Sequence, residues 1–405
     1  MYNDIEKFYD IVVIGAGPAG STAARFAAEA GCKVLLLERD REPGIPVRCA
    51  EGVSHNGISQ FILPDPRWIC TKVSSARFHA PNGESCDLSF PGENSFGYIL
   101  DRRVFDRSLA DLAVSKGVRL LTKADAVGLL RDKNSDETKA TKGVIFRHRK
   151  AIYQVQCSIV IGADGVESQV GRWAGIDTCL ALDDIYSLAQ YTVNNINIQN
   201  DICHFYLGKN YIPSGYIWVF PKSSSQANIG AGMCGNAIRE GKSVLYYLDK
   251  FMHKNFPKAS INCSIFGGEP SKAGHDFVKN NVMLVGDAAQ QADPLTGAGI
   301  VQGMIGGKYC GETAAKALKT KDFSLLKEYP DKWENHLGKN QRFMYLLRNK
   351  THKLLDRQLN KIMASIRKIP REELSLARIF RETVFDDPAL VAKLATDFLI
   401  AKLKA

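Results

Sequence analysis

The sequence lacks any long apolar run. No stretch of the 405 residues approaches the roughly eighteen apolar residues needed to cross a bilayer. Residues 1–10 carry acidic side chains and no apolar segment, which predicts no secretory signal peptide. We therefore expect a protein that is made and kept in the cytoplasm.

Cysteine pairs with metal-binding spacing are also missing. The ten cysteines are scattered from Cys32 to Cys310, and no two of them form a CxxC pair. In a reducing compartment, such thiols are mostly small buried apolar groups. The sequence therefore predicts no metal site, whether zinc or iron–sulfur.

The composition is that of an ordinary globular protein, but its positive charge is unevenly distributed along the chain. The 45% hydrophobic and 24% charged fractions fit two or three globular domains. The net charge is +10, and residues 332–368 hold ten Lys and Arg against two acidic residues. Nucleic acid, an anionic membrane surface or an acidic protein would each suit such a stretch, and composition does not choose among them.

The chain opens as a βαβ unit. An apolar strand at 11–14 is followed by a glycine turn, a helix at 21–30 and a strand at 33–38. Gly15 permits the tight turn, Gly17 lets the backbone approach a pyrophosphate, and Gly20 allows close packing of helix on strand. Glu38 ends the second strand, where it can accept from a ribose hydroxyl. This pattern favours a dinucleotide site over a chance glycine turn, but it does not separate FAD from NAD.

The later elements divide the chain into three parts. A helix at 103–116 and a strand at 119–122 lead to a buried strand at 158–162, and strands dominate from 185 to 266. A strand at 281–285 and a helix after Gly299 return to the Rossmann pattern, and the last 75 or so residues read as helix. We predict a split dinucleotide domain at 1–72, 99–175 and 275–325, a substrate domain at 73–98 and 176–274, and a helical region at 326–405.

Two further motifs decide the cofactor. One runs from Ile161 to Gly165 as IGADG, and the other is VGDAA at 285–289 followed by DPLTGAG at 293–299. With the glycine turn, they resemble the flavoprotein hydroxylase superfamily. The resemblance implies an α/β fold that binds FAD, with Asp287 on the ribitol and Gly297 to Ile300 beside the flavin ring. No second GxGxxG unit is present, so we expect reducing equivalents to arrive transiently.

Two short patterns point to one branch of that superfamily. Residues 46–52 match PxxCxxG, and residues 216–221 with Gly230 match YxWxFPx8G. Both patterns resemble the geranylgeranyl reductases, and among them the archaeal digeranylgeranylglycerophospholipid reductases. Tyr216, Trp218 and Phe220 alternate along a strand and share one face. Alone they favour an ordinary half-buried sheet face; the resemblance implies a wall of an apolar tunnel for a prenyl chain.

The resemblance also implies the residues that contact FAD. Besides Gly15, Gly17, Gly20 and Gly297, these are Ala19, Glu38, Cys49, Ala50, Gly52, Arg102, Ala126, Asp287, Gly299 and Ile300. Arg102 stands at the head of a helix, from which it can reach the pyrophosphate or the ring edge. Its neighbour Arg103 is an alternative for the same position.

Cys49 is the candidate catalytic residue. An isolated alkene has no carbonyl to polarise it, so hydride transfer is slow unless a proton reaches the other carbon. A thiol that stays protonated in apolar surroundings is able to tune or perform that proton delivery. The alternative is a buried cysteine with only a structural place on a cofactor loop.

The expected function is FAD-dependent saturation of geranylgeranyl chains in archaeal ether phospholipid precursors. Electrons would come from ferredoxin, another carrier or a reduced nicotinamide, and nucleic acid is not an expected partner. An aromatic-ring monooxygenase of the same superfamily is the alternative, and a non-catalytic flavoprotein that docks on membranes is the weakest reading.

The basic stretch at 332–368 also has helical periodicity. Its apolar residues recur near helical spacing from Phe343 to Ile366, while Arg342, Lys353, Arg357, Lys361 and Lys368 tend toward other faces. One basic amphipathic helix would suit peripheral binding to the inner face of an anionic membrane. A helix that covers a domain and exposes a basic face to solvent fits equally well.

Overall fold

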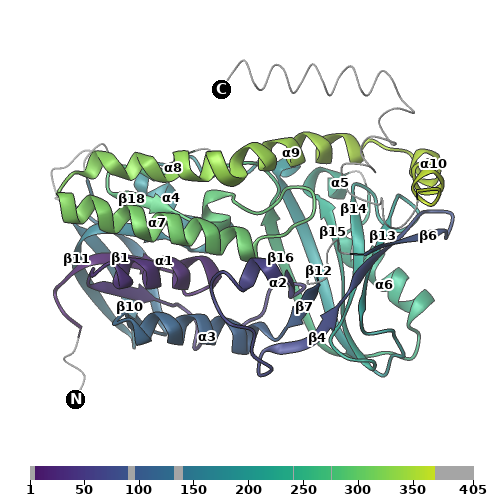
Figure 1. Ribbon diagram of the computed structural model, residues 1–405, viewed down its shortest axis with the longest axis horizontal. Coiled ribbons are helices and arrows are strands. Elements are labelled where there is room, and N and C mark those ends of the chain that lie inside the picture. The colour runs from purple at the N-terminus through teal and green to yellow at the C-terminus, as the bar shows by residue number, and fades with distance from the viewer. Residues whose placement is uncertain (1–4, 90–95, 132–139, 240, 275, 370–405) are drawn as a thin grey trace.

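The computed structural model describes residues 5–89, 96–131, 140–239, 241–274 and 276–369. Within these ranges, two sheet-based halves lie side by side along the long axis of the molecule (Figure 1). The chain passes between the halves repeatedly, so each half is assembled from segments that are distant in sequence.

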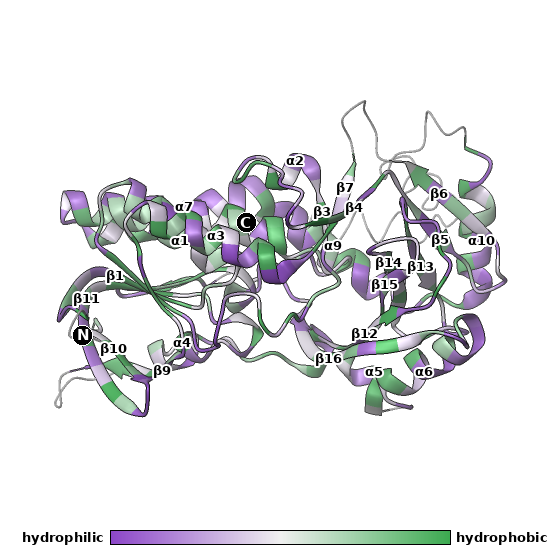
Figure 2. Ribbon diagram, turned by 90° about the horizontal axis from the view of Figure 1, so that it is seen from below, coloured by the Kyte–Doolittle hydropathy of each residue, from purple (hydrophilic) through white to green (hydrophobic). Residues whose placement is uncertain are grey.

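A mainly parallel sheet forms the core of the first half. Its parallel strands follow the order β18-β11-β1-β2-β8, with β17 antiparallel at one edge and β10 and β9 extending β11. The central strands are runs of Val, Ile and Leu because both of their faces are buried, and they stand out as hydrophobic in Figure 2. The strands are β1 (Phe8–Ile14), β2 (Val34–Leu37), β8 (Arg119–Leu121), β9 (Ala124–Leu130), β10 (Gly143–His148), β11 (Ala151–Gly162), β17 (Val278–Lys279) and β18 (Val282–Leu284).

Helices α1 (Pro18–Glu29) and α7 (Ile300–Thr320) pack closely against each other in this half. Small residues make the approach possible. A Cβ atom on Gly307 would lie 2.5 Å from the carbonyl oxygen of Ala19, and one on Gly311 would lie 2.4 Å from that of Ala23. Helix α3 (Arg102–Ser115) packs on α1, and the short helix α4 is Gln169–Ala174.

An antiparallel sheet forms the second half, with one parallel pairing between β13 and β5. Its order is β16-β12-β15-β14-β13-β5-β6, and helix α6 (Val244–Asn255) packs on one face. The hairpin β5–β6 reaches this sheet from the first part of the chain. The strands are β5 (Ser75–His79), β6 (Ser85–Ser89), β12 (Ile185–Asn194), β13 (Ile202–Leu207), β14 (Gly215–Pro221), β15 (Gln226–Cys234) and β16 (Ser260–Pro270).

The alternation predicted for residues 216–220 is present in β14. Ile217 and Val219 point into the apolar core under α6, so Trp218 and its two aromatic neighbours point to the opposite face. Glycine in the next strand makes room for the indole ring, since a Cβ atom on Gly230 would lie 2.2 Å from Trp218 Cζ2. The glycine of the YxWxFPx8G pattern thus has a direct packing reason.

A small third sheet joins the halves. Strand β7 (Gly97–Leu100) pairs with β3 (Gly52–Ser54) on one side and β4 (Ile69–Val73) on the other. The 3₁₀ helices are η1 (Gly165–Glu167), η2 (Leu182–Asp184), η3 (Gly286–Ala289) and η4 (Phe323–Lys327), and the remaining short helices are α2 (His55–Ile58) and α5 (Gly235–Arg239).

The C-terminal region is helical, as expected, and the basic stretch at 332–368 is divided among several short helices. The described part consists of α8 (Glu328–Trp333), a π turn (Glu334–Gly338), α9 (Lys339–Thr351) and α10 (Asp356–Ile366). A turn at residues 352–355 separates α9 from α10. Arg348 is only 2% exposed and packs inward from α9, so part of the basic stretch belongs to the interior. Residues 370–405 of the predicted helical region lie outside the described residues.

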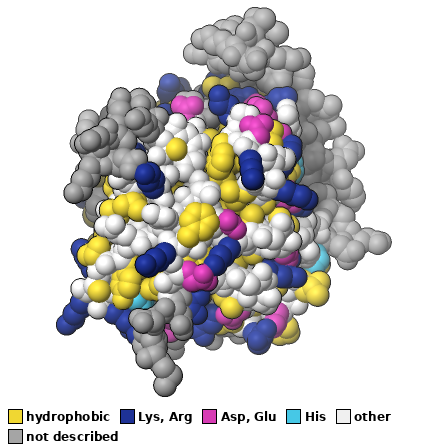
Figure 3. Space-filling model, turned by 90° about the vertical axis from the view of Figure 1, so that its left-hand side faces the viewer, with side chains coloured by type: hydrophobic (Ala, Val, Ile, Leu, Met, Phe, Trp, Pro, Cys, Tyr) yellow, Lys and Arg dark blue, Asp and Glu magenta, His cyan; other side chains and the backbone are white. Residues whose placement is uncertain are grey.

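The mixed α/β class, with a Rossmann-type half, an antiparallel sheet and C-terminal helices, is confirmed. None of the helices in the described part of the chain is both long enough and apolar enough to cross a membrane. At the end of the molecule that carries β9 and β10, basic, acidic and apolar side chains are interspersed (Figure 3).

Candidate active site

A single cavity of about 1580 Å³ runs from the glycine turn of the first half to the second sheet. All of the residues predicted to bind cofactor or substrate line it. They are Gly15, Gly17, Ala19, Gly20, Glu38, Cys49, Ala50, Gly52, Arg102, Ala126, Tyr216, Trp218, Phe220, Asp287, Gly297, Gly299 and Ile300. Residues from six separate parts of the chain, at 15–38, 49–52, 102, 126, 216–220 and 287–300, therefore meet around one space.

The glycine turn has the geometry that its sequence predicted. Gly15 adopts a φ of +103°, and a Cβ atom there would lie 2.2 Å from the carbonyl oxygen of Ala163. A Cβ atom on Gly20 would lie 1.9 Å from the carbonyl oxygen of Gly15. Gly17 instead faces open space at the N-terminus of α1, where backbone N–H groups favour a phosphate.

The acidic groups at this end of the cavity suit a nucleotide with ribose hydroxyls. Glu38 accepts hydrogen bonds from the Ala16 and Asp40 N–H groups, and burial raises its pKa. Asp164 accepts from the Val170 N–H through one oxygen, while its other oxygen is buried without a hydrogen-bond partner among the described residues. These groups and the open space at Gly17 fit FAD, for which Asp287 would hold the ribitol and the loop at 297–299 would flank the ring.

The loop that carries Cys49 is fixed by a buried carboxylate that the sequence analysis did not single out. Glu51 is 2% exposed and has a φ of +73°. Its carboxylate accepts from Lys222 Nζ at 2.5 Å, from Asn228 Nδ2 at 2.6 Å and from the Arg102 N–H at 2.8 Å. Glu51 thereby ties the loop to Lys222 directly after β14, to β15 of the second sheet and to the start of α3.

A second set of hydrogen bonds links this loop to the aromatic strand. Trp218 Nε1 donates to Gln190 Oε1 at 2.9 Å, and Gln190 Nε2 donates to the carbonyl oxygen of Cys49 at 2.9 Å. The tunnel wall and the Cys49 loop are therefore connected through one amide side chain. A change in the position of the indole ring displaces Gln190, and with it the loop.

Cys49 and Arg102 lie next to each other at the middle of the cavity. Cys49 Sγ accepts from the Glu51 N–H at 3.2 Å, and burial raises the pKa of the thiol above its usual 9.0. Arg102 forms a two-pronged ion pair with Asp106, which is one turn further along α3. Its guanidinium is thus partnered within the protein, and its expected reach to a pyrophosphate stays a prediction. Arg103 pairs with Asp101 instead.

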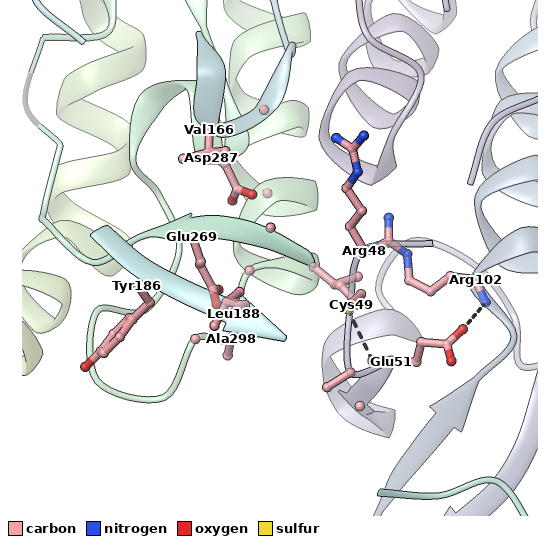
Figure 4. Close-up of a pocket in the computed structure, with 18 of the residues that line it drawn as sticks. Arg48, Cys49, Glu51, Arg102, Val166, Tyr186, Leu188, Glu269, Asp287 and Ala298 are labelled. Carbon is pink, nitrogen blue, oxygen red and sulfur yellow. Dashed lines mark hydrogen bonds between the residues drawn. The ribbon is translucent and has the colours of Figure 1, made fainter. Parts of the chain in front are cut away.

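Facing Cys49 across the cavity is a group of acidic and phenolic side chains (Figure 4). Asp287 projects from η3, and Glu269 projects from the end of β16 toward the loop around Ala298. Tyr186 lies beside Glu269, and its Oη is 2.7 Å from His352 Nε2. Sequence reasoning missed Glu269, because no motif or periodicity sets it apart from other strand residues.

The other end of the cavity is apolar. Side chains on the aromatic face of the second sheet line it: Ala76, Phe78, Leu88, Cys203, Phe205 and Leu207. Leu354, just before α10, and Leu359, within α10, complete the lining. The rings of Phe78 and Phe205 stack with centroids 5.1 Å apart. These side chains suit a hydrocarbon chain, because they offer dispersion contacts, while Lys209, Thr351 and His352 add polar groups to the cavity lining.

Comparisons with known proteins agree with this arrangement. A family model described as "Geranylgeranyl reductase catalytic domain" matches residues 184–268, and one described as "FAD dependent oxidoreductase" matches residues 10–200. A digeranylgeranylglycerophospholipid reductase of Methanococcoides burtonii is 40% identical over 93% of this chain and 92% of its own length. One from Methanosarcina mazei is 41% identical over 91% of each chain.

Solved structures give the same picture. A geranylgeranyl bacteriochlorophyll reductase-like protein from Thermoplasma acidophilum has a TM-score of 0.89 and 32% identity, covering 96% of this chain and 99% of its own. A flavin-dependent brominase, at 15% identity and a TM-score of 0.67, shares the fold alone. The resemblance drawn from the motifs is confirmed, and the chain belongs to the digeranylgeranylglycerophospholipid reductase family of FAD-dependent oxidoreductases.

Proposed function

We propose that this enzyme binds FAD and saturates isolated C=C bonds in the geranylgeranyl chains of an archaeal ether phospholipid precursor. The observation that carries the proposal is the continuity of the cavity. A nucleotide-shaped end with Gly17 and Glu38 opens directly into an apolar end lined by aromatic side chains. A prenyl chain in that apolar end would have its double bonds brought up to the Cys49 loop.

Different residues would bind the cofactor, position the alkene and assist proton transfer. The glycine turn and Glu38 would hold the adenosine and pyrophosphate, and Asp287 the ribitol. Bound FAD, once reduced, supplies the hydride. Tyr216, Trp218 and Phe220 would position the alkene and keep water away from it, and the Cys49 thiol, which burial keeps protonated, would tune or perform delivery of the proton.

The test is anaerobic. The purified protein is loaded with FAD, reduced with dithionite and mixed with geranylgeranylated glycerophospholipid. We expect a mass gain of two for each double bond reduced. Unchanged lipid, with FAD shown to be bound and reduced, would refute the proposal. Oxygen uptake that depends on an aromatic substrate would point instead to a monooxygenase.

The role of Cys49 has its own test. Cys49→Ala and Cys49→Ser are compared with the parent protein for FAD content and for single-turnover lipid reduction. We expect both variants to keep FAD and to reduce the lipid at least roughly tenfold more slowly, since a proton-transfer partner contributes factors of about 10² to 10⁴. Full turnover by Cys49→Ala leaves the thiol a structural group only.

We also propose that α10 contacts an anionic lipid surface and that electrons come from a diffusing carrier or reduced nicotinamide. The support for membrane contact is that Arg357, Lys361 and Lys368 are exposed on or after α10, while Leu359 of the same helix lines the cavity. A lipid held at the membrane surface would thus enter near α10. Binding to anionic liposomes that does not weaken with added salt rules out this basic contact.

A further inference from the structure

Glu269 lines the cavity from the end of strand β16, directly before Pro270. It is paired in register with Tyr186 of β12, so the two side chains point to the same face of the sheet. Figure 4 shows its carboxyl directed into the cavity, opposite the Cys49 loop. Its Oε2 lies 2.9 Å from the position that a Cβ atom on Gly297 would take, which brings it against the loop that begins α7.

No hydrogen bond or ion pair reaches the Glu269 carboxyl from the described residues. The phenol of Tyr186 is engaged with His352, and the Tyr216 hydroxyl donates to the carbonyl oxygen of Thr296 at 2.6 Å. Its charged neighbours on other elements are acidic: Asp287 on η3 and Asp293 in the loop before α7. Burial and these two carboxylates raise the pKa of Glu269 well above its usual value.

The Glu269 side chain is half-buried and faces the cavity, without a protein partner among the described residues. Once cofactor and lipid fill the cavity and exclude water, a carboxyl there is desolvated, which is a cost that an apolar side chain would not carry. Perturbed acids that face a cavity are, for this reason, concentrated at reacting centres. The arrangement resembles neither an ion pair that holds two elements together nor a capping interaction.

We propose, on the basis of the proposed function, that Glu269 is the acid that protonates the alkene. Reduced FAD, when bound, would supply hydride to one carbon of the double bond. The O–H bond of the Glu269 carboxyl breaks, and its proton forms the new C–H bond at the other carbon. The product is a saturated CH–CH unit, the cofactor is left oxidised, and the Glu269 carboxylate regains a proton from water before the next turnover.

This assignment limits Cys49 to tuning. The pKa of the Cys49 thiol starts from 9.0 and that of the Glu269 carboxyl from 4.5, and burial raises both. A carboxylic acid held protonated is the stronger acid of the two, and proton transfer becomes easier by up to about tenfold for each unit of pKa difference. The thiol lies across the cavity from Glu269.

The test compares Glu269→Gln, which keeps the shape and removes the acidic proton, with Glu328→Gln as a matched control on α8, where the side chain is half-exposed and outside the cavity. Single-turnover lipid reduction is measured anaerobically from pH 5 to 10 on FAD-loaded, reduced protein. The parent rate should fall as Glu269 loses its proton at high pH. In Glu269→Gln the rate should drop at least roughly tenfold and lose that dependence, with FAD content unchanged.

A second measurement does not depend on turnover. Infrared spectra at neutral pH should contain the carbonyl stretch of a protonated carboxyl that is absent from Glu269→Gln and present in Glu328→Gln. Glu269→Asp, which retains an acid, should recover part of the rate and keeps the test valid if the Gln variant fails to bind FAD. A parent-like rate and pH profile in Glu269→Gln, or no such infrared signal, overturns the proposal.

The two proposals fail in different ways. If the parent protein with bound, reduced FAD leaves the lipid unchanged, the proposed function is wrong, and Glu269 loses its role with it. If the parent protein reduces the lipid and Glu269→Gln does so equally well, only the assignment of Glu269 is wrong.

Discussion

Replacing Lys222 by Met should destabilise the protein and loosen the Cys49 loop. The Lys222 and Glu51 side chains are 11% and 3% exposed. The substitution therefore leaves the Glu51 carboxylate buried without its cationic partner. Breaking such a buried pair costs about 3–5 kcal/mol. Because Asn228 Nδ2 and the Arg102 N–H still donate to Glu51, we expect the lower end, about 3 kcal/mol.

The assay is thermal unfolding of the FAD-free protein, arranged as a double-mutant cycle with Glu51→Gln. An unfolding entropy of about 2 cal/mol/K per residue converts 3 kcal/mol into a fall of the midpoint by about 3–4 °C. The double variant should be more stable than the sum of the single losses predicts, because it buries no unpaired charge. FAD affinity should fall in Lys222→Met as the loop is released.

Strictly additive losses, or a Lys222→Met midpoint within about 1 °C of the parent protein, would refute this reasoning. Either result would mean that the carboxylate finds water or another donor, and that the pair does not hold the loop. Lys316→Met provides the control, since that lysine pairs with Glu328 on the surface and should cost well under about 1 kcal/mol.

Three further predictions follow from the same structure. Gly20→Ala should abolish FAD binding, measured by flavin absorbance, because its Cβ would lie 1.9 Å from a backbone oxygen. Trp218→Phe removes the donor to Gln190 and should slow lipid reduction about fivefold with FAD retained, as one hydrogen bond contributes about 1 kcal/mol. Burial lowers the pKa of His79 from 6.5 to about 4. Between these two pH values, the folded state therefore binds fewer protons than the unfolded state. The unfolding temperature should therefore fall as pH drops from 6.5 to 4, and less steeply in His79→Gln.

Local signals carried most of what the sequence could predict. Each of three features can be recognised from a short contiguous stretch of sequence: the glycine turn, the alternating aromatic strand and the Cys49 loop. All three line the cavity. The cofactor and the family followed from motifs in fixed order. These features need no knowledge of which distant segments meet.

The missed residues depend on contacts between distant segments. Lys222 and Glu51 are 171 positions apart, and neither is unusual in its own surroundings. Glu269 is distinguished only by the absence of a partner, which becomes visible once β12, η3 and the 293–299 loop are in place. The periodicity of the C-terminal apolar residues likewise did not reveal the turn between α9 and α10, because both helices keep the same spacing of apolar residues.

The parallel pairing of β13 with β5 has a consequence for synthesis on the ribosome. Ser75 of β5 pairs with Ile202 of β13, so the β5–β6 hairpin emerges long before the strand that completes its place in the sheet. At about 5–20 residues per second, the wait is on the order of ten seconds. Throughout that interval an unpaired strand edge and the apolar faces of Ala76 and Phe78 are open to other chains. Cells that produce this enzyme at high rates should therefore depend on chaperones to keep the nascent hairpin from aggregating.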